Sequence, residues 1–539
     1  MVRASEQQGV QEYRVAVSDD GGDALRQALT AAAAWTGEDA SRSARVVLAE
    51  GVHRISPVDA VSDEAAIVIS DAARLTIDGT GSELLFDDPH RGGIDLRRSH
   101  AVTLRGFTVD YAEPSFTQGT IRAVDHAAGT FDFVPAVGYP DFGDRVLFTG
   151  TGYGTLRDAG GGSLKSSVRQ TFLIDYETTA SSDGSFRVTV QPSDRAWMFQ
   201  IEEGDGFVVG HRGDRHGIRI DGCERITLRD VTIHAAPCAA VLAHESSALL
   251  LERLTVARRA GSSRWISTNA DAVHCQGGRR GPQIVGCRFE GMHDDGVNLY
   301  VHARPVAEVR DGRTIVLEGG GPMAPGDVLQ FVDAPSGAIL DEVAVQAVVP
   351  GEPAAVRLVH PLPDSVTEGA AVYNRSNALP GFRIDDCRFH DFRGIGVRLK
   401  ASSGIVADSV FERLSGCALW IANDPGWSEG PLGSHDVEIV GNRFTDAPGD
   451  ASLQSWPHSS ATVMIELFSG DDGPATARGH ERITVRDNDI AQTARTAVFV
   501  GGAAEVVIED LRVRAVEGAA WLGTRDSDVR VGAIEHGVR

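Results

Sequence analysis

The sequence predicts an all-β protein, a right-handed parallel β-helix with an N-terminal capping helix and two small β-barrel or sandwich insertions. Phrases such as "ERITLRDVTIHA", "PQIVGCRFEGM" and "HDVEIVGNRFTDA" each read as a short alternating strand, a polar turn and another short strand. They recur roughly 22 to 32 residues apart, as expected when each coil must stack on its neighbours to bury its apolar face. Two stretches interrupt this period with hairpin-like patterns. The strands are too short for leucine-rich repeats, whose LxxLxL pattern is also missing.

The N-terminal segment "DDGGDALRQALTAAAAWTG" predicts a capped amphipathic helix, because an aspartate-rich start precedes an alanine and leucine run. We expect this helix to cover the first coil and hide the open end of the core. The following "ARVVLAEGVHRI" predicts a strand, a turn and a strand.

The interruptions divide the chain into five segments. We predict the cap and first coils in 1–115, a β-barrel-like insertion in 116–215 and coils with the candidate catalytic aspartates in 216–302. A second insertion is expected in 303–376, and the C-terminal coils in 377–539. Both insertions return to similar phrases, "GIRIDGC" and "GFRIDDC", which indicates that each rejoins the solenoid at the same point of a coil.

The six cysteines form no CxxC pair and no zinc-ligand spacing. Three of them recur in one context, "IRIDGC", "PQIVGC" and "FRIDDC", which favours buried thiols stacked along the repeat over disulfides. No metal or other cofactor is predicted.

The net charge of −24 opposes binding to nucleic acid or to an anionic membrane. No apolar run is long enough to span a bilayer. The N-terminus "MVRASEQQGV" lacks the apolar region of a signal peptide, yet we expect the native protein to be secreted or extracytoplasmic. A homo-oligomer is compatible with the sequence, which does not fix the oligomeric state.

Three carboxylates stand in two similar phrases, Asp271 in "ADAVHCQ" and Asp294 and Asp295 in "DDGVNLY". An ungapped alignment with "FRGIGVR" and "LSGCALW" predicts an inward column at the fourth position of each phrase: Val273, Val297, Ile395 and Cys417. It stacks Asp271 on Asp295, with Arg393 on the next coil, because neighbouring parallel strands lie about 4.8 Å apart. Asp294 falls outside this column and reaches the same cleft only at a bend, which Gly296 permits.

This arrangement suits inverting glycoside hydrolysis, which needs a protonated carboxylic acid opposite a carboxylate that holds water. Crowding raises carboxyl pKa values and keeps one group protonated. The stacked pair Asp271 and Asp295 would share the water, and Asp294 would be the acid. Aspartates are also common in β-helix turns, where they satisfy backbone groups. The register of these three beside histidine, asparagine and arginine positions favours a site.

The phrases "RWISTNADAVHC", "CRFEGMHDDGVNLYVH", "DFRGIGVRLKAS" and "WSEGP", with "VDYAEPSFTQGTI" upstream, resemble glycoside hydrolase family 110. This resemblance covers most of the chain. It implies an exo-acting, inverting α-galactosidase that releases terminal α-1,3-linked galactose, including that of the blood-group B determinant, with Asp271, Asp294 and Asp295 as catalytic residues. The residues in matching motifs that it implies as sugar contacts are Arg264, His274, Asn298, Arg393, Trp427 and Glu429.

Other functions stay open at this point. The aspartate phrases are shared with polygalacturonase-type hydrolases, although this chain has "NAD" for their Asn-Thr-Asp and lacks their later Gly-His-Gly. A polysaccharide lyase would use the carboxylates to bind calcium and Arg393 or Arg398 as the base. A non-catalytic carbohydrate-binding solenoid would bind an oligosaccharide without turnover. The sequence does not choose between branched and linear galactosides.

Overall fold

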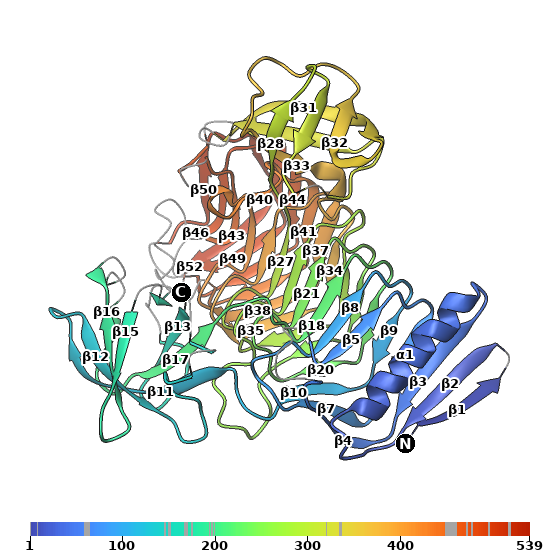
Figure 1. The fold of residues 1–539 in the computed structure, drawn as a ribbon. Helices are drawn as coiled ribbons and strands as arrows, with labels where there is room; N and C mark the ends of the chain where they lie inside the picture. The colour runs from blue at the N-terminus through green and yellow to red at the C-terminus, as the bar shows by residue number, and fades with distance from the viewer. Residues whose placement is uncertain are drawn as a thin grey trace.

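The fold is seen in a computed structural model of the chain (Figure 1). The residues that it describes are 2–7, 9–58, 65–144, 147–148, 152–165, 171–173, 176–192, 195, 198, 200–319, 321–333, 337–447, 461–469, 473–475, 478–493, 496–515 and 519–538.

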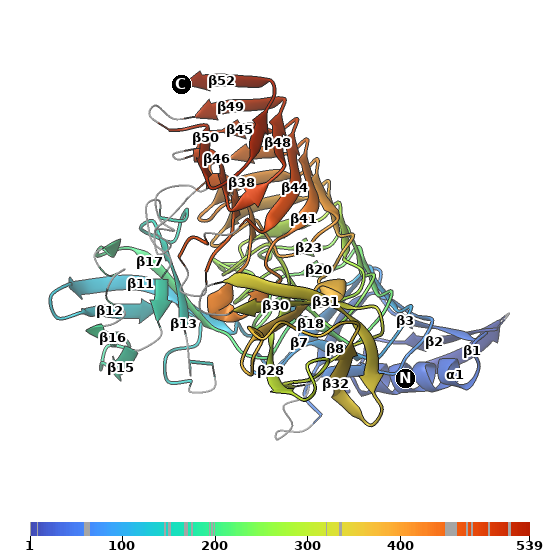
Figure 2. The same cartoon turned by 90° about the horizontal axis from the view of Figure 1, so that it is seen from above.

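Three sheets run the length of a solenoid, and each coil adds one strand to each sheet (Figures 1 and 2). Their strands are parallel except for β1, which pairs antiparallel with β2. Sheet A contains β1 (Val2–Gln7), β2 (Val10–Val15), β3 (Ser43–Leu48), β6 (Leu75–Asp78), β9 (Thr103–Arg105), β19 (Thr227–Arg229), β22 (Leu250–Glu252), β25 (Gln283–Val285), β34 (Arg383–Asp385), β37 (Gly404–Ala407), β41 (His435–Val440), β44 (His480–Arg486), β47 (Ala503–Ala504), β48 (Val506–Glu509) and β51 (Val529–Val531). Sheet B contains β4 (Gly51–Ile55), β7 (Ser82–Phe86), β10 (Thr108–Tyr111), β20 (Thr232–Ile233), β23 (Thr255–Val256), β26 (Arg288–Glu290), β35 (Arg388–Phe392), β38 (Val410–Leu414), β42 (Arg443–Thr445), β45 (Asp489–Ala491), β49 (Leu511–Ala515) and β52 (Ile534–Val538). Sheet C contains β5 (Ile67–Ser70), β8 (Ile94–Arg97), β18 (Ile218–Asp221), β21 (Val241–His244), β24 (Val273–Gln276), β27 (Val297–His302), β36 (Val397–Leu399), β39 (Leu419–Ala422), β43 (Ala461–Glu466), β46 (Thr496–Gly501) and β50 (Leu522–Arg525).

The parallel β-helix predicted from the repeat is therefore confirmed. Its core is a continuous apolar cluster built from the inward residues of all three sheets. Phenylalanine occupies one buried column of sheet B on four successive coils, at Phe289, Phe389, Phe411 and Phe444. Phe389 and Phe411 stack with centroids 4.6 Å apart. Phe444 continues the stack on the next coil, 5.0 Å from Phe411. Like residues stack because equivalent positions of successive coils are direct neighbours.

The cysteines are buried, free thiols, as the repeat predicts. Cys287 and Cys387 lie in equivalent turns between sheets A and B of neighbouring coils, whereas Cys223 follows β18 of sheet C, so the predicted stacking holds for two of the three phrases. All three cysteines are at most 3% exposed. Burial among apolar side chains raises the pKa of the Cys223 thiol to about 11. These three thiols are packing groups of the core.

The predicted capping helix is α1 (Asp23–Glu38). The Asp20 carboxylate accepts hydrogen bonds from the Gly22 and Ala24 N–H groups at its start. Its alanine and leucine face joins the solenoid core, since Leu25 and Leu29 are at most 3% exposed. The helix lies beside β3 at one end of the solenoid (Figure 1).

Two further sheets leave the solenoid (Figure 1). The first, between β10 and β18, is mainly antiparallel and comprises β11 (Phe116–Asp125), β12 (Thr130–Pro135), β13 (Gly152–Arg157), β14 (Thr171–Leu173), β15 (Tyr176–Ala180), β16 (Phe186–Val190) and β17 (Gly206–His211). The second, between β27 and β34, is a closed barrel of β28 (Arg304–Val309), β29 (Thr314–Leu317), β30 (Val328–Asp333), β31 (Ala338–Val349), β32 (Glu352–Leu358) and β33 (Ala371–Asn374). Each has an apolar core of its own. The 3₁₀ turn η2 (Arg375–Asn377) follows the barrel. The first insertion returns to sheet C at β18 and the second to sheet A at β34, so the prediction that both rejoin the solenoid at the same point of a coil is wrong.

Within the ranges given above, no helix has the length and apolar character needed to cross a bilayer.

Candidate active site

A cavity of about 570 Å³ opens on the outer face of sheet C. Its floor is formed by outward side chains of β24, β27, β36 and β39. Tyr153 of β13 and Arg212, which directly follows β17, line it from the first inserted sheet. The loop with the 3₁₀ turn η3 (Pro425–Trp427) and strand β40 (Glu429–Gly430) lines it as well, and β40 pairs with β27. Segments far apart in the sequence thus enclose one site.

All three candidate aspartates line this cavity. One oxygen from each of Asp271, Asp294 and Asp295 lies within 4.8 Å of the others. Their side chains are only 4%, 15% and 5% exposed, respectively. The predicted convergence of two consecutive aspartates on one cleft is therefore observed.

The strand register agrees with the predicted alignment for the first two phrases and differs for the others. Val273 pairs with Val297, which places Asp271 opposite Asp295. On the next coils the partners of Val297 are Val397 and then Leu419, so the predicted column with Ile395 and Cys417 is wrong by two residues. A shift of two keeps every side chain on the same face of a strand, so the alternating pattern could not reveal it.

As a consequence, Ile395 lies beside Asp295, and Arg393 lies beside His293. The Ile395 N–H donates to Asp295 Oδ1 at 2.8 Å. The Arg393 guanidinium donates to the His293 carbonyl oxygen at 2.6 Å. The outward row next to the carboxylates is His274, Asn298, Arg398 and Trp420. The ungapped alignment would have put Gly396, the fifth residue of "FRGIGVR", where Arg398 lies.

Glycines permit the close approach of the coils at this point. A Cβ atom on Gly296 would lie 2.4 Å from the Gly396 carbonyl oxygen. Gly394 has a φ of 128°, in the left-handed region, and a Cβ there would lie 2.5 Å from the Asp294 carbonyl group. The backbone therefore brings Asp294 and Asp295 into the cavity only with glycine at these positions.

Asp271 is held by polar partners on both oxygens. Its Oδ1 accepts the Asp295 backbone N–H at 3.3 Å, and its Oδ2 is bonded to His274 Nδ1. Burial alone would raise the pKa of Asp271, but the His274 charge and hydrogen bond, with Arg212 behind them, bring it below its ordinary value. Asp271 is therefore the ionised member of the stacked pair.

Asp295 has the opposite environment. Burial, then the charges of Asp294 and Asp271, raise its pKa to about 7. Its nearest cationic group is Arg398, whose Nη1 lies 3.7 Å from Oδ2. Since Oδ1 accepts the Ile395 N–H, Oδ2 is the oxygen free to carry a proton toward the cavity.

Asp294 is paired with cations from two directions. Arg212 forms an ion pair with its Oδ2, and Arg393 Nη1 lies 3.8 Å from its Oδ1. The Arg212 guanidinium also lies 3.4 Å from the centroid of the Tyr153 ring. Asp294 is thus the carboxylate with the closest positive charge.

Two predicted sugar contacts, Asn298 and Glu429, share a buried cation. Lys400 is fully buried and donates to Asn298 Oδ1 at 3.0 Å and to Glu429 Oε2 at 2.5 Å. Burial would raise the pKa of Glu429, but Lys400 and Arg398 lower it to about 2. Lys400 therefore holds the side chains of Asn298 and Glu429 in place from the buried side of the cavity.

The two tryptophans at the cavity differ in exposure. Trp427 is 60% exposed, on η3 at the rim. Trp420 is 4% exposed, and the Arg398 guanidinium lies 4.6 Å from the centroid of its ring. An exposed aromatic face beside a polar cavity can stack on a sugar ring, and this applies to Trp427.

Two of the predicted sugar contacts do not line the cavity. Arg264 pairs with the buried Asp110 and donates to the Tyr111 carbonyl oxygen at 2.9 Å. Arg393 lies beneath Asp294, 4% exposed. Trp427, Glu429, His274 and Asn298 do line it.

Several lining residues carried no signal in the sequence: Tyr153, Arg212, His216, Cys238 and His302. The seventh positions of the four aligned phrases, Gln276, Tyr300, Arg398 and Trp420, were predicted to face outward on the side of the site, and all four line the cavity. Tyr153 and Arg212 had no local signal, because the path of the first inserted sheet back to the solenoid places them there.

A metal ion would need several ligand atoms close together. Among the acidic, histidine and cysteine side chains of the described ranges, those of the three aspartates meet this condition. Hard cations such as calcium take six to eight oxygen ligands. Here the guanidinium groups of Arg212, Arg393 and Arg398 already lie beside the carboxylates. This charge balance disfavours a bound cation.

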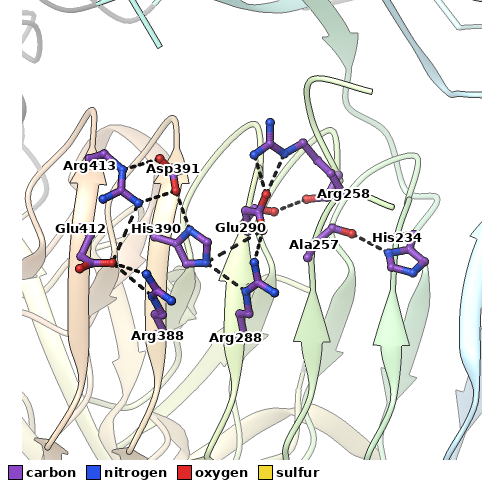
Figure 3. Close-up of polar contacts among 11 residues, drawn as sticks. His234, Ala257, Arg258, Arg288, Glu290, Arg388, His390, Asp391, Glu412 and Arg413 are labelled. Carbon is purple, nitrogen blue, oxygen red and sulfur yellow. Dashed lines mark hydrogen bonds and ion pairs between the residues drawn. The ribbon is translucent and has the colours of Figure 1, made fainter. Parts of the chain in front are cut away.

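A second charged cluster lies along sheet B (Figure 3). Its carboxylates are each bonded to arginine: Glu290 to Arg258 and Arg288, Asp391 to Arg413, and Glu412 to Arg388. His234 Nδ1 contacts the Ala257 carbonyl oxygen at 2.8 Å. The charged groups of this cluster therefore neutralise one another within and between neighbouring coils.

No family model matches the chain. Three curated proteins with similar sequences are named α-1,3-galactosidase. Alpha-1,3-galactosidase A of Shewanella woodyi is 24% identical over 455 residues, covering 79% of this chain and 71% of its own. Alpha-1,3-galactosidase B of Bacteroides fragilis is 26% identical over 414 residues, covering 71% and 68%. Alpha-1,3-galactosidase A of Streptomyces avermitilis is 22% identical over 557 residues, covering 88% and 82%.

Among solved structures, the A-module of a mannuronan C-5 epimerase from Azotobacter vinelandii aligns with a TM-score of 0.43 at 11% identity, covering 95% of this chain and 96% of its own. An exopolygalacturonase from Thermotoga maritima aligns with a TM-score of 0.39 at 10% identity, covering 97% and 91%. The resemblance predicted from the aspartate phrases is thus confirmed at the level of the family, because the chain is similar to proteins named α-1,3-galactosidase over most of its length.

Proposed function

We propose that this protein is an exo-acting glycoside hydrolase that releases terminal α-1,3-linked galactose from oligosaccharides or glycans, with inversion at the anomeric carbon. The observation that carries the proposal is the convergence of Asp271, Asp294 and Asp295 in one largely buried cavity. The names of its relatives supply the substrate. Terminal galactose of the blood-group B type is a candidate substrate.

Asp295 is the proposed general acid, and Asp271 the base that activates water. Hydrolysis needs one carboxyl group protonated and the other ionised. The raised pKa of Asp295 and the lowered pKa of Asp271 provide this difference. The sequence alignment had instead predicted Asp294 as the acid, because Asp294 falls outside the column of Asp271 and Asp295. The ion pair of Asp294 with Arg212 supports a role as a fixed negative charge.

The sugar contacts that we propose are Asn298, Trp427 and Glu429, which line the cavity. His274 lines it as well, but its ring is bonded to Asp271 and Tyr300. Arg393 and Arg264 are proposed to act indirectly, because they bond to other protein groups. We also propose an extracytoplasmic location and a site that works without a metal.

Proton NMR of a terminal α-1,3-galactoside incubated with the protein tests this function. Galactose that appears first as the β-anomer supports inversion. The α-anomer first would instead indicate a retaining enzyme, for which closely spaced carboxyl groups, about 5 Å apart, are typical. If the protein binds the galactoside but releases no galactose, it is a non-catalytic carbohydrate-binding solenoid.

A chelator separates hydrolysis from a lyase reaction. Turnover that persists in chelator, without products that absorb in the ultraviolet, supports the hydrolase. Unsaturated products that depend on calcium would support the lyase and contradict the proposal.

A further inference from the structure

His274 has no ring nitrogen free for a sugar hydroxyl. Its Nδ1 is bonded to Asp271 Oδ2, and its Nε2 lies 2.8 Å from the Tyr300 hydroxyl oxygen. The same hydroxyl oxygen accepts the Gln276 Nε2–H at 2.7 Å and lies 3.4 Å from His302 Nε2. Gln276 Nε2 also lies 3.1 Å from His274 Nε2. The four side chains extend from Asp271 along β24 and β27.

The contacts of this hydrogen-bonded network fit a protonated His274 and also a neutral ring that donates from Nδ1 and accepts at Nε2. Although burial lowers the pKa of His274, the charges of Asp271 and Glu429 raise it and favour the protonated ring. An imidazolium ring donates two N–H bonds, here one to Asp271 and one to the Tyr300 oxygen. The two lone pairs of that oxygen then accept from His274 and Gln276, and the Tyr300 O–H is directed to a neutral His302. Every group has a partner before any substrate binds.

We propose that His274 is a positioning residue that holds Asp271 as an ionised, oriented base, with Tyr300 fixing the ring, and that it is not a sugar contact. This inference rests on the proposed function, in which Asp271 is the base. The ring edge packs against Tyr300, with centroids 5.2 Å apart at an interplanar angle of 90°, which further limits its rotation.

The charges around this hydrogen-bonded network favour the same arrangement. Burial lowers the pKa of His274, but Asp271, and then Glu429 of β40, raise it above its ordinary value. Burial lowers the pKa of His302. Arg212 faces Asp271 and stabilises its ionised form, while His216 opposes the charge on His274. Glu429 opposes the ionised form of Asp271.

The test compares His274→Gln and Tyr300→Phe with the natural protein across pH. Without the imidazolium, the Asp271 pKa rises, so the acidic limb of kcat/KM moves to higher pH, by about one unit. We expect kcat to fall about tenfold to hundredfold in His274→Gln, as for other residues that orient a reactive ligand, with KM little changed. Tyr300→Phe should give a smaller shift in the same direction. Free imidazole should restore part of the rate to His274→Gly.

His234→Gln is the matched control. His234 bonds to a backbone carbonyl group on sheet B and lies outside the hydrogen-bonded network of His274. A raised KM with an unmoved acidic limb in His274→Gln would overturn the proposal and make His274 a sugar contact. Thermal unfolding of each variant shows whether it is folded.

A readout without activity separates this inference from the proposed function. Nitrogen NMR of the histidines, without substrate at pH 7, should show His274 as an imidazolium, and Asp271→Asn should lower its pKa. A neutral His274 at pH 7 would contradict the positioning role even in an active enzyme. If His274 is an imidazolium but the protein has no galactosidase activity, the ion pair of His274 with Asp271 stands and the proposed function is wrong.

Discussion

Arg212 and Asp294 form an ion pair between the first inserted sheet and the solenoid. Arg212 directly follows β17, and its guanidinium stacks on the ring of Tyr153 from β13. Asp294 belongs to the coil that supplies β27. The inserted sheet therefore provides the cation nearest to one of the three carboxylates, and the site is complete only when both parts of the chain are folded.

Replacing Arg212 by leucine should lower kcat/KM by about a hundredfold, because Asp294 loses its nearest cation and its charge then acts on Asp295. Arg212→Lys keeps the charge and should retain more activity, and Tyr153→Leu should have a smaller effect than Arg212→Leu. Kinetics of the three variants measure this order. Equal rates in Arg212→Leu and the natural protein would show that the pair does not matter for turnover.

Asp295 as the acid predicts a rate that falls as pH rises through about 7, because its proton is lost there. Asp295→Asn cannot donate the proton, so kcat should drop by about 10²- to 10⁴-fold for a galactoside with a poor leaving group. A good leaving group, such as a nitrophenolate, should recover much of the loss. If Asp294→Asn showed this recovery and Asp295→Asn did not, Asp294 would be the acid.

Asp295→Asn should also make the fold more stable at alkaline pH. The folded-state pKa of Asp295 lies near 7, above the unfolded value of about 3.9, so the folded state binds a proton between these values. Stability therefore decreases as pH rises from about 4 to about 7. The asparagine variant lacks this loss, and urea unfolding at pH 5 and pH 8 should show its advantage growing with pH. An advantage that is constant with pH would contradict the raised pKa.

Lys400→Met should destabilise the protein by about 3–5 kcal/mol, because it leaves the nearly buried Glu429 without its cation. The double variant Lys400→Met with Glu429→Gln removes both charges and should regain part of that loss. Unfolding free energies of the two single variants and the double variant give the coupling. Additive effects would show that the pair contributes no energy of its own.

Arg264→Leu should change stability more than catalysis. Arg264 is bonded to the buried Asp110, outside the cavity, and Arg259 remains as a second partner of that carboxylate. We expect a loss of about 1–3 kcal/mol of unfolding free energy and an unchanged KM. A raised KM with normal stability would instead make Arg264 a sugar contact.

Much of the fold is encoded locally. Short alternating strands, the recurring "CRF" phrases and the capping helix were readable because each coil repeats a pattern that its own residues dictate. The pairing of Asp271 with Asp295 followed from the same repetition. The next coil was placed two residues out of register, since a two-residue slip preserves the alternation on which the alignment depends. The predicted register therefore stacked Arg393 on Asp295, whereas Arg398 lies beside that carboxylate.

By itself, the sequence determined the solenoid, the interruptions and the three aspartates, because these depend on local patterns and on motifs. Only the tertiary structure decided the electrostatic differences among the aspartates. His274 reaches Asp271, Arg212 arrives from an inserted sheet to pair with Asp294, and Asp295 is left buried with Arg398 at 3.7 Å. A carboxyl pKa depends on burial and on charges a few ångströms away, and those neighbours come from distant parts of the chain.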